Sequence, residues 1–398
     1  MRRWRPRTAG RLWAVSRSSC LSPGGGSGSA GPMGPVGPSA GAQPVGPVGP
    51  SAGAQPVGPV GPSAGAQPLS PPSRRRPALL LFPGQGSQQV GMAGSMLALP
   101  RVRDMFAAAR QLLGYDLLDL CERGPPQRLL HTRHCQPAVF ITSLAAVEAL
   151  NARHPWVIEQ CVGAAGFSVG EFAALVFAGA MDFTEALYAV KVRAEAMQEA
   201  SDSTPSGMLS VVGRAETRYN YACLEAREHC KSLGIEEPVC EVANYLFPNG
   251  RVIAGHLQAL EFLQQNSRRF HLARAKLLPV SGAFHTRLMA SAAPALQRAL
   301  QDISVEKPLI PIYSNVDGKK YMHGPHIRRL LVKQLVSPVK WEQTMHAMYE
   351  RQQGTDFPDT FEVGPGKQLG TMLKQCNMKA WRQYRHLDME PTDQSEEE

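Results

Sequence analysis

Acidic residues are missing from the start of this 398-residue chain, where the first one is Asp104. Nine of the 42 lysines and arginines, all of them arginine, lie at or before Arg76. The remaining sequence therefore holds 33 basic and 33 acidic residues, so the formal net charge of +9 belongs to the N-terminal segment alone. Nucleic acid is not predicted as a primary partner, because a nucleic-acid surface needs positive charge clustered on the folded body.

Long apolar runs are also missing, since no unbroken stretch of 18 or more apolar residues occurs. The sequence therefore predicts no membrane span. The eight cysteines are dispersed, with no C-x-x-C pair and no paired histidine spacing. This pattern predicts reduced thiols in a reducing compartment and excludes both a zinc site and a disulfide framework.

The first twenty residues, "MRRWRPRTAGRLWAVSRSSC", combine six arginines, several hydroxyl side chains and no acid. This composition is typical of a mitochondrial transit peptide, which we expect over residues 1–25. A secretory signal would need an unbroken apolar core, and none is present. The alternative is a basic disordered segment without a targeting role.

A twelve-residue unit is repeated three times between Met33 and Pro68, as "MGPVGPSAGAQP" and then "VGPVGPSAGAQP" twice. Proline and glycine at this density provide no apolar face to bury, so residues 26–77 are expected to form a disordered linker. Collagen is excluded because glycine does not recur at every third position. Residues 386–398 are expected to form a solvated acidic tail.

The folded body is predicted to begin with the apolar run "ALLLF" at Ala78, followed by the turn "PGQGSQ". Such a run is typical of a strand buried on both faces of a parallel sheet. Helical patterns and a second buried strand at Cys161 to Ala165 follow. We therefore expect an α/β large domain over residues 78–205 and 282–385, with its site where strands end.

A different order of elements is expected over residues 206–281. Segments such as "GMLSVVG", "VCEVANYL" and "RVIAG" are typical strands, and helical patterns separate them. The resulting order, βαββαβ, is that of a ferredoxin-like domain. The sequence therefore predicts a small domain inserted in the large one.

The stretch "GAAGFSVGEF" at Gly163 to Phe172 places Ser168 between two glycines, after small apolar residues and before a helical run. A sharp turn from strand to helix would expose the serine at its apex and direct neighbouring backbone N–H groups toward a developing oxyanion. The alternative is a tight turn whose serine only caps the helix.

Three further positions are candidates for the same site. His285 in "SGAFHTRLM" is a candidate base, although any single histidine can also be structural. Arg193 starts from the edge of an apolar helical stripe, so it pairs with an internal acid, extends to water or awaits a carboxylate ligand. Gln85, in the turn "PGQGSQ", is a candidate for orienting a substrate oxygen or for donating its backbone N–H.

Seven motifs of the chain, taken in order, resemble those of the malonyl-CoA:acyl carrier protein transacylases. They are "LLLFPGQGSQQVGM", "GFSVGEFAALVFAGAM", "YAVKVRAEAMQEA", "GMLSVVG", "SGAFHTRLM", "QLVSPVKWEQTM" and "FEVGPGKQLG". The resemblance covers about Ala78 to Trp381. It implies a hydrolase-like parallel-sheet domain with a ferredoxin-like insertion. It also implies transfer of a malonyl group from malonyl-CoA to the phosphopantetheine thiol of acyl carrier protein, for fatty-acid synthesis in the mitochondrial matrix, without a metal or redox cofactor.

The resemblance assigns a role to each matching position. Ser168 would carry the malonyl group as an ester and His285 would act as the base. Arg193 would bind the malonyl carboxylate. The matching positions for the remaining roles are the backbone N–H groups of Gln85 and Val169 for the oxyanion hole, the carbonyl of Gln334 for orienting the histidine, and Phe284 for selecting malonyl over an α-methylated group.

One position departs from the family pattern, since Phe167 stands where many members have histidine before the nucleophile. A phenylalanine cannot donate a hydrogen bond to a substrate.

A serine hydrolase or thioesterase is the main alternative function, because a serine and a histidine serve either reaction. A basic scaffold for RNA or membranes is a third, supported only by the charge of the N-terminal segment. From the reference pKa of histidine, ~6.5, activity is expected to fall below about pH 6 to 7.

Overall fold

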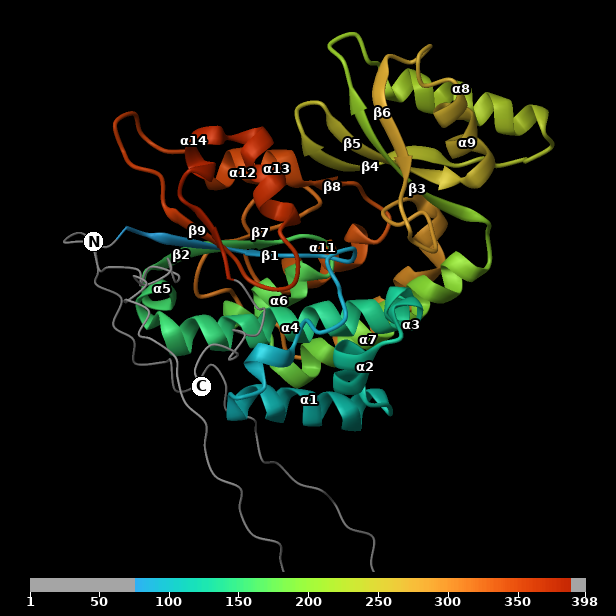
Figure 1. Cartoon of the computed structure of the whole chain (residues 1–398). Coiled ribbons are helices and arrows are strands. Elements are labelled where there is room, and N and C mark those ends of the chain that lie inside the picture. The colour runs from blue at the N-terminus through green and yellow to red at the C-terminus, as the bar shows by residue number, and fades with distance from the viewer. Residues whose placement is uncertain (1–75, 388–398) are drawn as a thin grey trace, which may run out of the picture. The chain divides into compact units, whose positions relative to one another are not determined.

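The computed structural model describes residues 76–387, which all belong to one structural unit. The expected transit peptide over residues 1–25 lies outside the described residues. Almost all of the expected linker (26–77) and acidic tail (386–398) also lie outside them. Two five-stranded sheets organise the described part of the chain (Figure 1).

The first sheet is parallel throughout, with the strand order β10-β9-β1-β2-β7. Its last strand extends through His386, one residue into the segment assigned to the tail. The strands are β1 (Ala78–Phe82), β2 (Cys161–Gly166), β7 (Ile312–Tyr313), β9 (Asp359–Glu362) and β10 (Tyr384–His386).

The central strand β1 is buried along its whole length, as its apolar sequence predicts. Leu79 and Leu81 pack on one face of the sheet, in a cluster with residues of α12, α13 and α14. Phe82 points to the other face, where its ring lies 5.8 Å from that of Phe177 in α6. Figure 1 shows α12 to α14 and the pair α4 and α6 on opposite sides of this sheet.

The helices outside the βαββαβ segment of the second sheet come from before and after it in the described chain. They are α1 (Pro100–Leu113), α2 (Leu117–Arg123), α3 (Pro126–Leu130), α4 (Thr132–Arg153), α5 (Pro155–Glu159), α6 (Gly170–Phe177), α7 (Phe183–Asp202), α10 (Ala293–Gln301), α11 (Gly324–Gln334), α12 (Trp341–Met348), α13 (Gln368–Cys376) and α14 (Met378–Trp381), with short 3-10 turns η1 (Gly94–Met96) and η2 (Arg287–Ala292).

The second sheet has the order β6-β3-β5-β4-β8 and is antiparallel except where β8 joins β4. Its elements run β3, α8, β4, β5, α9, β6, which is the βαββαβ order expected from the sequence. Their bounds are β3 (Ser206–Gly213), α8 (Tyr219–Ser232), β4 (Cys240–Phe247), β5 (Gly250–His256), α9 (Leu257–Gln265), β6 (Leu272–Leu277) and β8 (Val339–Lys340). The fold class is therefore confirmed, and the domain boundaries remain a prediction.

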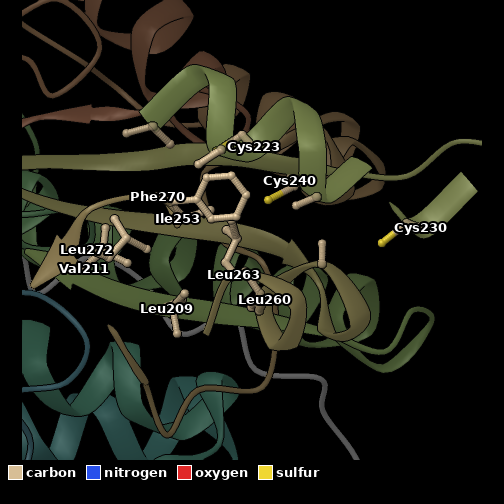
Figure 2. Packing of buried hydrophobic residues seen from close by; sticks show 14 residues of the cluster. Leu209, Val211, Cys223, Cys230, Cys240, Ile253, Leu260, Leu263, Phe270 and Leu272 are labelled. Atoms are coloured by element: carbon tan, nitrogen blue, oxygen red, sulfur yellow. The ribbon is translucent and has the colours of Figure 1, made fainter. Parts of the chain in front are cut away.

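The strand β8 lies outside the expected small domain of residues 206–281, so the second sheet is completed by a later part of the chain. A separate apolar core packs α8 and α9 on this sheet (Figure 2). It contains Phe270, Cys223 of α8 and Cys240 of β4, all buried. The seven cysteines in the described residues are free thiols.

None of the helices in residues 76–387 combines the length and the apolar character needed to cross a membrane.

Candidate active site

The turn from β2 to α6 is as sharp as the glycines of "GFSVG" suggest. A Cβ atom on Gly166 would lie 2.0 Å from the backbone of Gly170, and one on Gly170 would lie 2.4 Å from the carbonyl oxygen of Phe82. No side chain fits at either position. Ser168 at the apex has φ of 54°, a left-handed conformation that is uncommon for a residue other than glycine.

Asn315, which follows β7, braces this turn with both ends of its side-chain amide. Its Oδ1 accepts the backbone N–H of Ser168 at 2.6 Å, and its Nδ2 donates to the carbonyl oxygen of Gly166 at 2.7 Å. The strained turn is therefore held by a residue far away in the sequence.

His285 lies directly beside the serine. Its Nε2 is 2.9 Å from Ser168 Oγ, and its Nδ1 is 2.8 Å from the carbonyl oxygen of Gln334. A carbonyl can only accept, so Nδ1 carries the proton and Nε2 is free to accept the serine proton. The structure thus brings together the serine and histidine candidates of the sequence and the carbonyl that the family resemblance implied.

The pKa of His285 is lowered to about 4. Burial of the ring is the main cause, the positive charge of Arg193 adds to it, and the hydrogen bond to Gln334 opposes it. The expected fall of activity below about pH 6 to 7 was based on the pKa of a solvated histidine, and burial of His285 moves the predicted fall to lower pH.

Arg193, in α7, is fully buried and points into the same cluster. Its guanidinium donates to Ser168 Oγ at 3.0 Å, to Gln334 Oε1 at 2.8 Å and to Gln136 Oε1 at 2.6 Å. No carboxylate within the described residues forms a salt bridge with it, and its Nε is buried without a partner there. Of the three alternatives for Arg193, the structure shows neither an extension to water nor a direct salt bridge with an internal acid, because the guanidinium donates to neutral oxygens. Binding of a carboxylate by Arg193 stays a prediction.

The buried acid nearest to this cluster in the hydrogen-bond network is Glu171, the second residue of α6. It accepts hydrogen bonds from the backbone N–H of Asn315 at 2.9 Å, from the hydroxyl of Tyr321 at 2.8 Å and from the Nε2 of Gln334. Burial raises the pKa of Glu171 to about 7, although these donors and Arg193 oppose the shift. Burial likewise lowers the pKa of Arg193 to about 10.

The backbone N–H groups of Gln85 and Val169 have no hydrogen-bond partner within residues 76–387. Val169 immediately precedes α6, where helix N–H groups favour negative charge. Two hydrogen bonds hold the side chain of Gln85. Its Nε2 donates to Thr132 Oγ1 at 3.2 Å, and its Oε1 accepts from the Nε2 of Gln136 at 3.4 Å. The backbone of Gln85 is thus the part that stays available to a ligand.

Phe284 is buried next to His285, outside the hydrogen-bond network that joins the other candidates. Phe167 does not reach the serine through a polar contact either. Its ring packs against Trp341 of α12, with 5.3 Å between ring centroids. The ring of Phe167 therefore packs the turn against α12.

Sequence reasoning missed four polar residues of the cluster, which are Gln136, Glu171, Asn315 and Tyr321. One of them had a visible signal, since Glu171 is the only charged residue in the helix "GEFAALVF". A single acid within an otherwise apolar helix needs a buried partner. The described residues hold no group of three or more His, Cys, Asp or Glu side chains that could bind a metal ion.

Comparison with known proteins places this geometry in a family. The acyl transferase domain model matches residues 79–361. The human mitochondrial malonyl-CoA-acyl carrier protein transacylase is 62% identical over 332 residues, which cover 80% of this chain and 85% of the human protein.

Two solved structures are also similar. An acyl carrier protein S-malonyltransferase from Vibrio cholerae is 32% identical with a TM-score of 0.69, and the match covers 78% of this chain and 96% of that one. A malonyl-transacylase in complex with a type II PKS acyl-carrier protein has the same identity of 32% and TM-score of 0.69, with coverage of 78% and 94%. The α/β fold, the acyl transferase match and the identity to curated relatives agree, so the chain belongs to the malonyl-CoA-acyl carrier protein transacylases of the acyl transferase domain family.

Proposed function

We propose that this protein transfers a malonyl group from malonyl-CoA to the phosphopantetheine thiol of acyl carrier protein, through an ester on Ser168. One observation carries the proposal. Ser168 Oγ lies 2.9 Å from the Nε2 of His285 and 3.0 Å from the guanidinium of Arg193. A hydroxyl, a base and a carboxylate-binding cation thus meet at one oxygen, as the transfer of a malonyl group requires.

In the first half of the reaction, Ser168 Oγ attacks the thioester carbonyl of malonyl-CoA while its proton moves to His285 Nε2. A tetrahedral intermediate forms, and its oxygen carries the negative charge. The C–S bond then breaks, and His285 gives the serine proton to the departing CoA sulfur. CoA leaves as a thiol and malonyl-serine remains.

In the second half, the phosphopantetheine thiol gives its proton to the same Nε2 as its sulfur attacks the ester. The bond between Ser168 Oγ and the carbonyl carbon breaks, and the proton returns from His285 to the serine. This sequence predicts ping-pong kinetics, because CoA leaves before the carrier reacts.

The oxyanion is held in both halves by the backbone N–H groups of Gln85 and Val169. Both groups are free of other partners in residues 76–387, so they are available when the charge develops. Donors that are already in place lose little to reorganisation, and one such donor typically contributes about a 10²- to 10³-fold rate increase.

Arg193 provides the preference for malonyl. The malonyl carboxylate lies one methylene beyond the reacting carbonyl, and the guanidinium already contacts the oxygen to which that carbonyl becomes bound. An acetyl group has no anion to offer the buried cation. Phe284, buried beside His285, would restrict the space for an α-methyl substituent.

The cellular setting is a mitochondrion, as for the human relative, and we place the protein in the matrix, where it would supply malonyl groups for fatty-acid synthesis. The mitochondrial name of the human relative and the arginine-rich, acid-free N-terminal sequence support this assignment.

A discharge experiment separates transfer from hydrolysis. The enzyme is loaded with malonyl-CoA, freed of excess substrate, and mixed with carrier protein that carries phosphopantetheine or with carrier that lacks it. We expect loss of the adduct and gain of malonyl-carrier only with the thiol-bearing carrier. Release of free malonate at the rate of carrier loading would identify a hydrolase instead.

A further inference from the structure

Gln334 contacts His285 through its main chain, and Arg193, Ser168 and Glu171 through its side chain. Its main-chain oxygen accepts from His285, its Oε1 accepts from Arg193, and its Nε2 donates to the carbonyl oxygen of Ser168 at 3.1 Å. The same Nε2 also donates to the carboxylate of Glu171. Gln334 is 1% exposed, so water does not substitute for these contacts.

We propose that Glu171 is a positioning residue for malonyl selectivity, because its carboxylate fixes the side-chain amide of Gln334 and this amide holds Arg193 ready for the malonyl carboxylate. The inference rests on the proposed function, in which Arg193 binds that carboxylate.

The donor and acceptor pattern allows only one orientation of the Gln334 amide. Turning it over would bring its NH2 group against the guanidinium of Arg193, where both groups are donors, and its oxygen against the carboxylate of Glu171, where both are acceptors. Glu171 therefore determines which end of the amide faces Arg193.

Glu171 is itself held rigidly. One carboxylate oxygen accepts both the backbone N–H of Asn315 and the hydroxyl of Tyr321, and the other accepts from Gln334. Asn315 and Tyr321 follow β7, so the strand next to β2 fixes the carboxylate from outside the turn.

The distribution of charge agrees with this role. The negative charge of Glu171 lies one amide away from Arg193, close enough to favour the buried cation but without a direct salt bridge. A direct partner would occupy the guanidinium edge that a carboxylate ligand needs. The amide oxygen of Gln334 instead takes one donor position on Nη2, and the Nε of Arg193 keeps no partner within residues 76–387, so this donor stays available to a ligand.

The chain contains a matched control for this carboxylate. Glu362, at the end of β9, is also fully buried and accepts from two backbone N–H groups, those of Leu369 and Gly370, and from the hydroxyl of Tyr384. Its pKa is also raised to about 7 by burial. None of these three hydrogen bonds belongs to the network around Ser168, so Glu362→Gln measures the effect of losing a buried carboxylate away from the site.

The experiment compares three variants, Glu171→Gln, Glu362→Gln and Arg193→Ala. For each variant, the rate of single-turnover acylation by malonyl-CoA and by acetyl-CoA at pH 8 is measured from the intact mass of the protein. For Glu171→Gln we expect the malonyl-to-acetyl ratio of acylation rates to fall about tenfold or more, the size of one hydrogen bond to a charged group. Acetyl acylation itself should change less. Glu362→Gln should keep the ratio of the unmodified protein.

The outcomes are distinguishable. Equal losses for malonyl and acetyl in Arg193→Ala would overturn the proposed role of Arg193. A selective loss in Arg193→Ala together with an unchanged ratio in Glu171→Gln would overturn only the positioning role. If Glu171→Gln does not fold, Gln334→Met removes the amide but keeps the main-chain oxygen for His285. It should show the same loss of ratio, and an unchanged ratio would refute the inference.

Discussion

At the scale of single residues, the oxygen of Ser168 has two neighbours with different effects. His285 Nε2 lies 2.9 Å from it and would accept its proton in the proposed reaction, and the guanidinium of Arg193, 3.0 Å away, would bind the malonyl carboxylate. The same positive charge makes His285 a weaker base, because an imidazolium beside a guanidinium is disfavoured. In the proposed reaction, a malonyl carboxylate bound to Arg193 would offset that charge, so His285 would become a stronger base with the anionic substrate in place.

The lowered pKa of His285 predicts how the free enzyme responds to pH. Reaction of Ser168 with a small uncharged sulfonyl fluoride reports on the serine and histidine without involving the carboxylate site. Its rate should stay constant from pH 8 to below pH 5 and fall only near the pKa of about 4, where His285 takes up a proton. Circular dichroism at each pH provides the folding control.

Removing the positive charge gives the matched variant for this profile. In Arg193→Ala, the fall should shift to higher pH, because the neighbouring cation is one cause of the low pKa. A half-maximal rate near pH 6.5 in both proteins would mean that His285 is solvated, contrary to the structure.

Ser168, His285, Arg193 and the backbone of Gln85 could be predicted because each stands in a short motif with its own local signal. Their partners could not. Gln136 reaches Arg193 from a position 57 residues earlier in the chain, and its sequence surroundings are those of an ordinary buried helix. Hydrogen bonds of this kind depend on how helices pack, which a single sequence does not display.

At the scale of elements, the turn between β2 and α6 depends on a brace from β7. Ser168 and Asn315 are 147 residues apart, and the strand order places β7 next to β2. Nothing in the sequence around residues 312–315 indicates a place beside the serine, because the order of parallel strands depends on the crossover connections between them. This is why Asn315 was missed.

Replacing Asn315 by alanine should destabilise the protein and slow acylation. The change leaves the N–H of Ser168 and the carbonyl of Gly166 buried without their partner, at about 1 to 3 kcal/mol for each group. Urea denaturation measures the free energy of unfolding. Asn266→Ala, which removes one hydrogen bond to Phe262 in the second sheet's helix α9, is the control and should cost less. Equal losses would count against the brace.

At the scale of the whole described unit, strand pairing and an ion pair join the second sheet to the elements of the first, in addition to the covalent chain. The strand β8 pairs with β4 and leads directly into α12, which covers the first sheet. Beside this junction, Arg251 of β5 lies 3.1 Å from Glu342 of α12, and each side chain is 13% exposed. The sequence predicted the βαββαβ order but not β8, since two residues carry too little pattern to predict a strand.

This ion pair should matter for the stability of the whole unit. Arg251→Ala leaves Glu342 largely buried without its cation, and we expect a loss of roughly 3 kcal/mol in the free energy of unfolding. The exposed pair of Lys231 and Glu228 is the control, and Lys231→Ala should cost less than about 1 kcal/mol. Losses of the same size in both variants would show that the junction is no stronger than a surface contact.

The most direct test of the account is the mass of the protein after a brief exposure to malonyl-CoA. The unmodified protein should gain one malonyl group, and peptide mapping should locate it on Ser168. Ser168→Ala should gain none, while keeping the melting temperature of the unmodified protein within a few degrees. A malonyl adduct of equal yield in Ser168→Ala, or one mapped to another residue, would contradict the account.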